Sequence, residues 1–248
     1  MGRAHAHRTC RSPALAVGRG GVTSFRLASA NGGSLPPFVP GQHLPVTLAV
    51  PGHPHPIERN YSLSGPPGDP TYRITVKREA KGIASRFLHD RLTVGDEIEA
   101  RAPSGDFRLP GGETPLVLAS AGVGATPMLP MLLAAAASRT SRRVWFFHGV
   151  RNAAEHVLRR EADALARQVG TLSLHCFYSA PRPADLPLPP QVRQGRMTAA
   201  DLVASGAGPE ADYLLCGPPA FTAELASGLA DHGIPPARIH TEDFGPAA

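Results

Sequence analysis

Two short stretches of this sequence carry residue types that bind phosphorylated, ring-bearing ligands. The first, Arg59-Asn60-Tyr61-Ser62, offers a cation, an aromatic face and a hydroxyl, and alternation along a strand would send Arg59 and Tyr61 to one face. The second, Gly122-Val123-Gly124-Ala125-Thr126-Pro127, follows an apolar run and opens a helical pattern. A turn of this kind presents unpaired backbone N–H groups and a positive dipole end to a pyrophosphate. Their order and spacing predict two anionic cofactors and an electron-transfer enzyme.

The glycine stretch departs from the dinucleotide-binding fingerprint. Gly122 and Gly124 would let the backbone approach a phosphate, and Thr126 and Pro127 suit the N-cap and first helical positions. Proline replaces the third glycine of the fingerprint, and Arg151, not an acid, follows the second strand. These departures disfavour an ordinary dehydrogenase. A tight strand-to-helix turn without a ligand is the structural alternative.

Other segments with suitable chemistry also have plain structural alternatives. Residues 59–62 alone suit a surface strand with a cross-strand aromatic. Gly82-Ile83-Ala84-Ser85 opens a helix that is either a second phosphate anchor or a connector. Cys216-Gly217 closes a strand at the edge where parallel sheets bind ligands, so Cys216 either contacts a substrate ring or is a buried free cysteine.

The elements that must position these residues fall into two groups. Residues 1–20 resemble a loose, basic leader, and residues 21–110 contain short strands, turn residues and one helix, which predicts an antiparallel β-barrel. Residues 111–248 alternate β and α patterns, which predicts a doubly wound α/β domain with a parallel sheet. The predicted strands are 22–28, 43–50, 59–64, 72–78, 96–101, 116–120, 143–150, 172–178, 213–215 and 238–241, and the predicted helices are 83–92, 127–137, 153–168, 199–204 and 221–231.

Composition and charge narrow the function classes. Residues 1–110 carry 12 Arg and 2 Lys against 8 acidic residues, a net charge of +6, while residues 111–248 have a net charge of −1. No basic stripe with interleaved aromatics indicates nucleic-acid binding. Three cysteines are too few for a disulfide framework or an iron–sulfur cluster, and no metal site is expected. No apolar run is long enough to span a membrane, so we expect a cytoplasmic protein.

Taken together, these motifs resemble the ferredoxin–NADP reductase superfamily, most closely the reductase half of flavohaemoglobins and related multidomain oxidoreductases. The similarity runs from about Val22 to Pro246, nearly the whole chain. It rests on residues 59–62, 82–85 and 122–127, together with Phe38-Val39-Pro40-Gly41-Gln42-His43, Cys216-Gly217-Pro218 and the terminal Glu242-Asp243-Phe244-Gly245-Pro246. The resemblance implies FAD bound by an antiparallel flavin domain and NAD(P)H bound by the α/β domain.

The resemblance also implies roles for individual residues around the flavin. Arg59 would pair with the flavin diphosphate, Tyr61 would stack on the isoalloxazine, and Ser62 would hydrogen-bond near flavin N5. Phe244 would cover the opposite ring face, and Glu242 would tune electrostatics or relay protons. The remaining implied FAD contacts are His43 (tyrosine in many relatives), Asn60, Val76, Gly82, Ala84, Ser85 and Gly245.

The implied nicotinamide site lies in the second domain. Cys216 and Thr126 would flank the nicotinamide, and Ser62, Cys216 and Glu242 form the implied catalytic set. The other implied NAD(P) contacts are Gly122, Val123, Gly124, Ala125, Pro127, Arg151, Ser179, Arg182 and Gly217. Arg151 and Arg182 suit a 2′-phosphate, but no cluster of Arg, Lys and Tyr follows Ser179, so the sequence favours NADH over NADPH.

The sequence therefore predicts an FAD-dependent NAD(P)H oxidoreductase. A hydride would pass from nicotinamide to flavin, and electrons would then reach a separate ferredoxin-like, haem or oxygenase component. We expect a separate acceptor because no globin precedes Val22 and no cysteine-rich module follows Pro246, and the basic first domain favours an acidic partner. The alternatives are a non-catalytic electron-transfer or regulatory subunit of a larger complex, and a free-flavin reductase.

Overall fold

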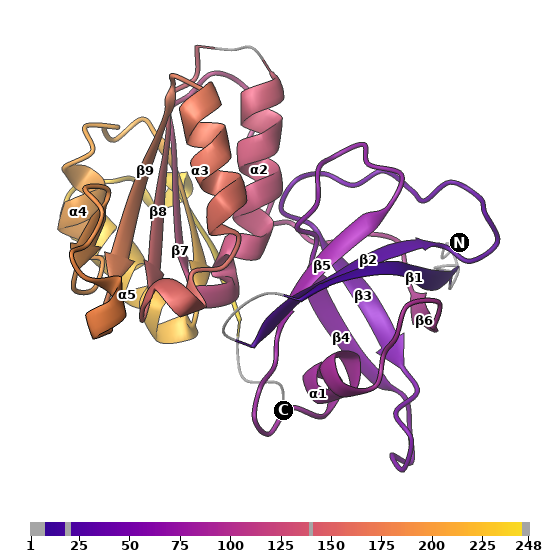
Figure 1. Ribbon diagram of the computed structural model, residues 1–248. Helices are drawn as coiled ribbons and strands as arrows, with labels where there is room; N and C mark the ends of the chain where they lie inside the picture. Colours follow the sequence, from indigo (N-terminus) through magenta and orange to yellow (C-terminus); the bar gives the residue numbers. More distant parts are fainter. Residues whose placement is uncertain (1–7, 18–20, 139–140, 245–248) are drawn as a thin grey trace. The chain divides into compact units, whose positions relative to one another are not determined.

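The chain divides into two compact units, Met1–Arg108 and Leu109–Ala248. The computed structural model describes residues 8–17, 21–138 and 141–244 (Figure 1). Each unit has its own sheet and its own hydrophobic core. The predicted fold class, an antiparallel first domain followed by an α/β domain with a parallel sheet, is confirmed. The division between the units lies slightly before the predicted one at residue 110.

The first unit is a six-stranded sheet that closes on itself. The strand order is β4-β3-β6-β1-β2-β5, and the described pairings are antiparallel. Leu63, directly after β4, bridges Ile74 of β5 and so joins the two outer strands. The elements are β1 (Arg8–Val17), β2 (Val22–Ser29), β3 (His43–Leu48), β4 (Ile57–Ser62), β5 (Tyr72–Lys77), α1 (Ile83–Asp90) and β6 (Glu97–Ala100).

Strand β1 corrects the prediction of a loose leader for residues 8–17, while residues 1–7 and 18–20 lie outside the described residues. Residues 8–17 form a strand between β6 and β2, and Cys10 pairs with Ile98 on one side and Ser29 on the other. The register shifts between Arg11 and Ala14, in the stretch that contains Pro13. A bulge of this kind tolerates a residue without a backbone N–H, such as Pro13. The proline and the basic residues explain why the sequence did not predict a strand here.

Strand β5 is buried along almost its whole length, although polar and apolar residues alternate in it. Tyr72 to Val76 are all buried. Its polar side chains have internal partners: Arg73 Nε donates to the Ser64 carbonyl at 3.1 Å, and Thr75 Oγ1 lies 2.8 Å from Ser64 Oγ. Polar residues can occupy a buried face when their hydrogen bonds are made within the protein.

The second unit is a six-stranded parallel sheet with helices on both faces. The strand order is β10-β9-β8-β7-β11-β12, so the order reverses between β7 and β11. Helices α2 and α3 pack on one face, and α4 and α5 on the other (Figure 1). The elements are β7 (Leu116–Ala121), α2 (Ala125–Ala137), β8 (Val144–Val150), α3 (Arg159–Gln168), β9 (Leu172–Tyr178), β10 (Val192–Gln194), α4 (Ala199–Val203), β11 (Asp212–Gly217), α5 (Pro219–Asp231) and β12 (Ile239–Asp243), with 3₁₀ turns at Gly122–Gly124, Ala153–Glu155, Pro183–Asp185 and Pro236–Arg238.

Polar side chains cap the start of α4 and the start of the 3₁₀ turn at 153–155. Thr198 caps α4 in a reciprocal pair with Asp201. Asn152 accepts a bond from the Ala154 backbone N–H, but the predicted helix over 153–168 is wrong, because it is broken into a 3₁₀ turn and α3. Leu158 stands at the break with a φ of 56°, a left-handed conformation that ordinary helices exclude. Strand β10 was not predicted, because it is only three residues long.

The amino-terminal edge of the parallel sheet holds a buried ion pair. Arg142 Nη2 lies 3.7 Å from Asp212 Oδ2, and both side chains are buried. Arg142 also donates to the Thr114 carbonyl at 2.6 Å and the Pro110 carbonyl at 2.8 Å. This arginine therefore ties the segment that enters the second unit to the start of β11.

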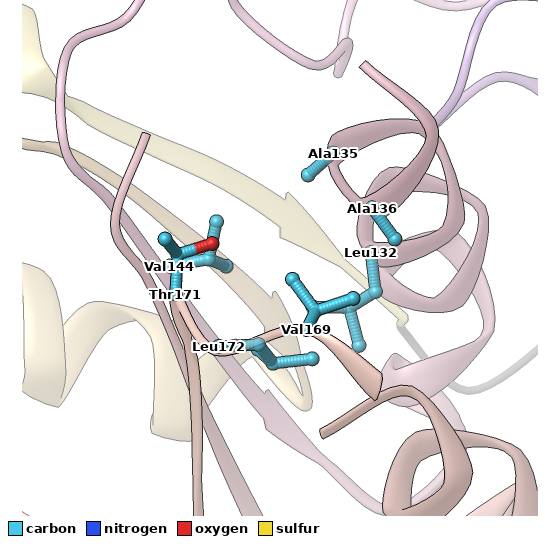
Figure 2. A pocket seen from close by; sticks show the side chains of 7 residues that line it. All are labelled: Leu132, Ala135, Ala136, Val144, Val169, Thr171 and Leu172. Carbon is cyan, nitrogen blue, oxygen red and sulfur yellow. The ribbon is translucent and has the colours of Figure 1, made fainter. Parts of the chain in front are cut away.

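A small apolar cavity lies at the same end of the sheet, beneath α2 (Figure 2). Its volume is about 10 Å³, roughly the space for one water molecule. It is too small for a cofactor, and it lies away from the carboxyl ends of the strands. Its lining residues are Leu132, Ala135, Ala136, Val144, Val169, Thr171 and Leu172.

Among the helices that the structure describes, none is long and apolar enough to cross a membrane.

Candidate functional site

In the first unit, the predicted flavin residues gather on the antiparallel pair β3 and β4. The register places His43 opposite Ser62 and Leu44 opposite Tyr61. Asn60 is exposed, whereas Arg59 and Tyr61 on the other side of the strand are partly buried. The pairing thus brings His43 together with residues 59–62 at one end of the barrel sheet.

Ser62 has an unusual hydroxyl. The residue is only 4% exposed, and its Oγ has no hydrogen-bond partner among the described residues. Leaving a buried hydroxyl unpaired costs about 1–3 kcal/mol, so such groups call for an explanation. A ligand atom at this position would supply the missing partner.

Tyr61 and Arg59 are two further residues of the predicted flavin site in the first unit. Burial raises the pKa of the Tyr61 phenol to about 12, and the nearby Arg59 guanidinium opposes that rise. The phenol is therefore neutral across the physiological pH range. Arg59 Nη1 donates to the Glu58 carbonyl at 2.7 Å, which directs the guanidinium along the strand.

His43 is held by the segment that follows β6. Its Nε2 lies 3.2 Å from Ser104 Oγ, and backbone hydrogen bonds pair His43 with Ser104 in both directions. Burial lowers the pKa of the imidazole below its usual value of 6.5. A Cβ on Gly105 would lie 2.9 Å from His43 Nδ1, so only glycine fits beside the ring. These contacts hold the His43 ring in place, and its lowered pKa keeps it largely neutral.

The start of α1 forms a close-packed turn. A Cβ on Gly82 would lie 2.5 Å from Ser85 Oγ, and that hydroxyl accepts a bond from the Glu79 backbone N–H at 3.1 Å. Ala84 and Ser85 are buried in the first helical turn. Val76, also among the predicted flavin contacts, is buried in β5, and its carbonyl lies 2.9 Å from His89 Nε2 of α1. A helix N-terminus can bind an anion, and the phosphate contact at residues 82–85 stays a prediction.

In the second unit, the Gly122 stretch lies at the end of β7, next to the point where the strand order reverses. Gly122 to Gly124 form a 3₁₀ turn before α2 begins at Ala125. Gly122 has a φ of +54°, and no atom lies within 4 Å of where its Cβ would be. This left-handed, open backbone position can face a phosphate without steric hindrance.

Gly124 packs against β11 in this turn, and Thr126 is not the helix cap that the sequence predicts. A Cβ on Gly124 would lie 2.1 Å from the Cys216 carbonyl oxygen, so this glycine allows α2 to pack on β11 and does not face open space. Thr126 is not the N-cap of α2, and Pro127 is not its first residue, because the helix starts earlier at Ala125. The Thr126 hydroxyl donates to the Val123 carbonyl at 2.8 Å and so stabilises the turn.

Cys216 and Glu242 are paired residues on the parallel strands β11 and β12. Cys216 is fully buried, and burial together with Glu242 and Asp243 raises the pKa of its thiol well above the usual value. Burial raises the pKa of the Glu242 carboxyl to about 7. The strand register therefore places a neutral thiol beside a carboxyl group that titrates near neutral pH.

The chain beyond β12 stays attached to the end of β11. The Phe244 backbone N–H donates to the Gly217 carbonyl at 2.9 Å. Gly217 itself is tightly enclosed, since a Cβ there would lie 2.8 Å from Phe221 and 3.1 Å from Ala121. Phe244 thus lies at the carboxyl edge of the sheet with Cys216, while Gly245 lies outside the described residues.

The predicted adenosine-side residues follow β8 and β9. The Ser179 backbone N–H donates to the Val150 carbonyl at 2.9 Å, and that of Ala180 to the Arg151 carbonyl at 2.8 Å, so the two strand ends stay paired. Arg151, Ser179 and Arg182 are all exposed. The Arg182 backbone N–H donates to Asp185, which closes the following turn. The structure therefore brings Arg151 and Ser179 together on one edge.

A buried polar cluster beneath this edge was missed by the sequence reasoning. His148 Nδ1 lies 2.8 Å from Ser120 Oγ, the His148 and His156 rings are 5.0 Å apart, and His156 Nδ1 lies 3.0 Å from the Tyr178 hydroxyl. Burial lowers the pKa of His148 to about 4 and that of His156 to about 2, so both rings are neutral. His148, the polar residue within the apolar run 144–150, was the signal available in the sequence.

Comparison with known proteins gives matches to both units. The protein family described as "Oxidoreductase FAD-binding domain" matches residues 21–109, and the family described as "Oxidoreductase NAD-binding domain" matches residues 118–226. A flavohemoprotein of Bacillus cereus is 37% identical over 234 residues, which cover 92% of this chain and 58% of that protein. A flavohemoprotein of Rhizobium meliloti is 39% identical over 231 residues, which cover 91% and 57%. The chain thus spans little more than half the length of these relatives.

Solved structures resemble the chain over nearly its whole length. The flavohem-like FAD/NAD-binding domain of nitric oxide dioxygenase from Vibrio cholerae superposes with a TM-score of 0.87 at 35% identity, covering 96% of this chain and 99% of that one. An Amycolatopsis cytochrome P450 reductase superposes with a TM-score of 0.83 at 29% identity, covering 99% and 72%.

Proposed function

The chain belongs to the FAD- and NAD-binding oxidoreductases of the ferredoxin–NADP reductase superfamily, and we propose that it passes electrons from NADH through FAD to an acceptor protein. The family establishes a flavin-dependent NAD(P)H oxidoreductase with FAD and NAD(H) as its cofactors. The observation that carries the proposal is the meeting of the Gly122 turn, Cys216, Glu242 and Phe244 at the carboxyl edge of one parallel sheet, beside the reversal of strand order.

The residues of the first unit fit FAD. The unpaired buried hydroxyl of Ser62 supports a hydrogen bond to the flavin ring, and the neutral Tyr61 phenol supports stacking on it. Arg59 and the N-terminus of α1 at Gly82, Ala84 and Ser85 would hold the diphosphate. His43, Asn60 and Val76 would complete the contacts from neighbouring strands.

The residues of the second unit fit a nicotinamide dinucleotide. The open backbone at Gly122 supports pyrophosphate binding together with Val123 and the start of α2. Cys216, Gly217 and Thr126 would flank the nicotinamide, and the residues beyond β8 and β9 would receive the adenosine half. NADH is the proposed donor, because residues 180–192 add no Lys, Tyr or second Arg to the exposed Arg182.

Bound FAD supplies the chemistry, because it accepts a hydride from reduced nicotinamide and can release electrons singly. The chain's own residues position the two cofactors and set the electrostatics of the site. Glu242, with its pKa near 7, would hold or release a proton at its carboxyl oxygen, and the neutral thiol of Cys216 would contact the nicotinamide without forming a bond to it.

The proposed acceptor is a haem or iron–sulfur protein with an acidic surface. The names of the relatives, flavohemoproteins and a cytochrome P450 reductase, support a haem acceptor. The net charge of +6 on residues 1–110 supports an acidic partner. Reduction of such an acceptor should slow as salt is raised, because screening weakens charge steering. An unchanged rate between low and high salt would contradict the acidic partner. A cytoplasmic location stays a prediction.

The experiment that tests this function uses the purified full chain. We expect a yellow protein with flavin absorption that bleaches when NADH is added without oxygen, and that then reduces an artificial one-electron acceptor over many turnovers. Folded protein that binds no flavin after reconstitution would overturn the proposal. Bleaching without turnover would favour a non-catalytic subunit, and flavin that dissociates readily during each cycle would favour a free-flavin reductase.

A further inference from the structure

We propose that a hydrogen bond between Thr222 and Asp243 positions the chain terminus, and thereby sets how readily nicotinamide reaches its site. The inference rests on the proposed function, in which Phe244 covers the flavin. It concerns two residues to which neither the motifs nor the proposed site gives a role. Both lie in the second unit, at the carboxyl edge of the parallel sheet.

The bond joins two elements that are distant in sequence. Thr222 lies in the first turn of α5 and is 1% exposed, and its hydroxyl donates to Asp243 Oδ1 at the end of β12. The same hydroxyl lies 3.0 Å from the Pro219 carbonyl. A hydroxyl has one hydrogen, and the charged carboxylate is the stronger acceptor of the two.

The start of α5 also favours a carboxylate at this position. The helix begins after Pro218 with no side-chain cap and no acidic residue in its first turn. The helix dipole makes such an end favourable for negative charge. Asp243 brings a carboxylate from β12 to this end of α5, where it accepts the hydrogen bond from Thr222.

The geometry links this contact directly to Phe244. Asp243 pairs with Gly217 in the strand register, and the next residue, Phe244, donates its backbone N–H to the Gly217 carbonyl at 2.9 Å. Gly217 is enclosed by Phe221, the residue before Thr222. These contacts therefore pack the end of β11, the first turn of α5 and residues 243–244 against one another. Loss of the Thr222–Asp243 bond would loosen Phe244 while leaving the sheet core intact.

The first test measures the protein without any cofactor. Thr222→Val removes the donor while keeping the shape, and Thr222→Ser is the matched control that keeps the hydroxyl. We expect hydrogen exchange at the Phe244 amide to accelerate roughly tenfold in Thr222→Val, the scale of one hydrogen bond to a charged acceptor. Exchange in β7 and β8 should stay unchanged, and Thr222→Ser should behave like the natural chain. Equal exchange at Phe244 in all three proteins would overturn the inference.

The second test uses the protein loaded with FAD. A loosened Phe244 competes less with nicotinamide, so the KM for NADH should fall several-fold in Thr222→Val, with Thr222→Ser unchanged. A lower thermal midpoint with the same KM would show a merely structural role and would overturn the inference. If Thr222→Val does not fold, Asp243→Ala with Asp243→Asn as control gives the same comparison. Failure of the natural chain to bind FAD would refute the proposed function, while the exchange measurement would still test the bond.

Discussion

Gly124 and Cys216 are in backbone contact: a Cβ on Gly124 would lie 2.1 Å from the Cys216 carbonyl oxygen and 2.7 Å from its carbonyl carbon. The start of α2 and the end of β11 thus meet with no room for a side chain. Because these atoms belong to the backbone, neither partner can move aside as a flexible side chain would. The close approach fixes the Gly122 turn relative to Cys216.

The variant Gly124→Ala should therefore be strongly destabilised. Forcing a methyl group into this contact must displace α2 or β11, and overpacking of this kind typically costs about 1–3 kcal/mol or more. Urea unfolding should show the loss. Gly170→Ala is the control, since a Cβ there meets nothing within 4 Å, and it should unfold like the natural chain. Equal stability of the two variants would contradict the contact.

The variant Ser62→Ala should separate cofactor binding from folding. Its hydroxyl has no partner among the described residues, so removing it from the flavin-free protein should leave stability unchanged or slightly raised. With FAD bound, flavin reduction by NADH should slow by roughly 10- to 100-fold, the effect of losing one well-placed hydrogen bond. Thermal unfolding of the apoprotein and stopped-flow bleaching provide the two readouts. A destabilised apoprotein would show that the hydroxyl has a structural partner.

Glu242 should give the reaction a pH dependence near neutrality. Burial raises the pKa of this carboxyl from 4.5 to about 7, so it is protonated below that pH and ionised above it. We expect kcat/KM for NADH to change with an apparent pKa near 7. In Glu242→Gln the inflection should vanish, with activity fixed near the level of the protonated form. An identical pH profile in both proteins would refute the role.

The buried histidines should make the protein sensitive to acid. The fold lowers the pKa of His148 to about 4 and of His156 to about 2, whereas unfolded histidine titrates near 6.5. Their stabilising contribution is complete above pH 6.5 and is lost as pH falls below it, by about 1.4 kcal/mol per pH unit for each ring. Glu242 acts in the opposite sense, because its raised pKa favours the folded state as pH falls from 7.

Urea unfolding between pH 5 and 7 checks this sensitivity. The variant His148→Asn keeps a polar group near Ser120 but removes one titrating ring, so the slope of stability against pH should become shallower. His156→Phe should act in the same way. Slopes that match the natural chain in both variants would show that neither ring is responsible.

The coenzyme preference rests on the exposed residues after β8 and β9. We expect kcat/KM to be higher with NADH than with NADPH, because residues 180–192 add no Lys, Tyr or second Arg to Arg182. Arg182→Ala should affect the two coenzymes about equally. A loss confined to NADPH would show that Arg182 binds a 2′-phosphate and would reverse the proposed preference.

Much of the fold could be predicted from local patterns. The apolar run of β9 and the short helix α4 were identified because each signal lies within a few residues. The role of Gly124 could not be foreseen, since the atom that excludes a side chain comes from β11, far along the chain. The same limit applies to His148 and His156, which are brought together only when the chain packs around the strand ends.

Strand β1, the first strand of the chain, lies in the middle of the sheet of the first unit. It lies in the interior of the strand order, with β6 on one side and β2 on the other, although every recognisable motif lies after it. Clipping the chain just before Gly21 would leave the flavin motifs intact and yet open the sheet along its length. We therefore expect FAD binding to depend on this segment, although the predicted flavin contacts all lie outside it.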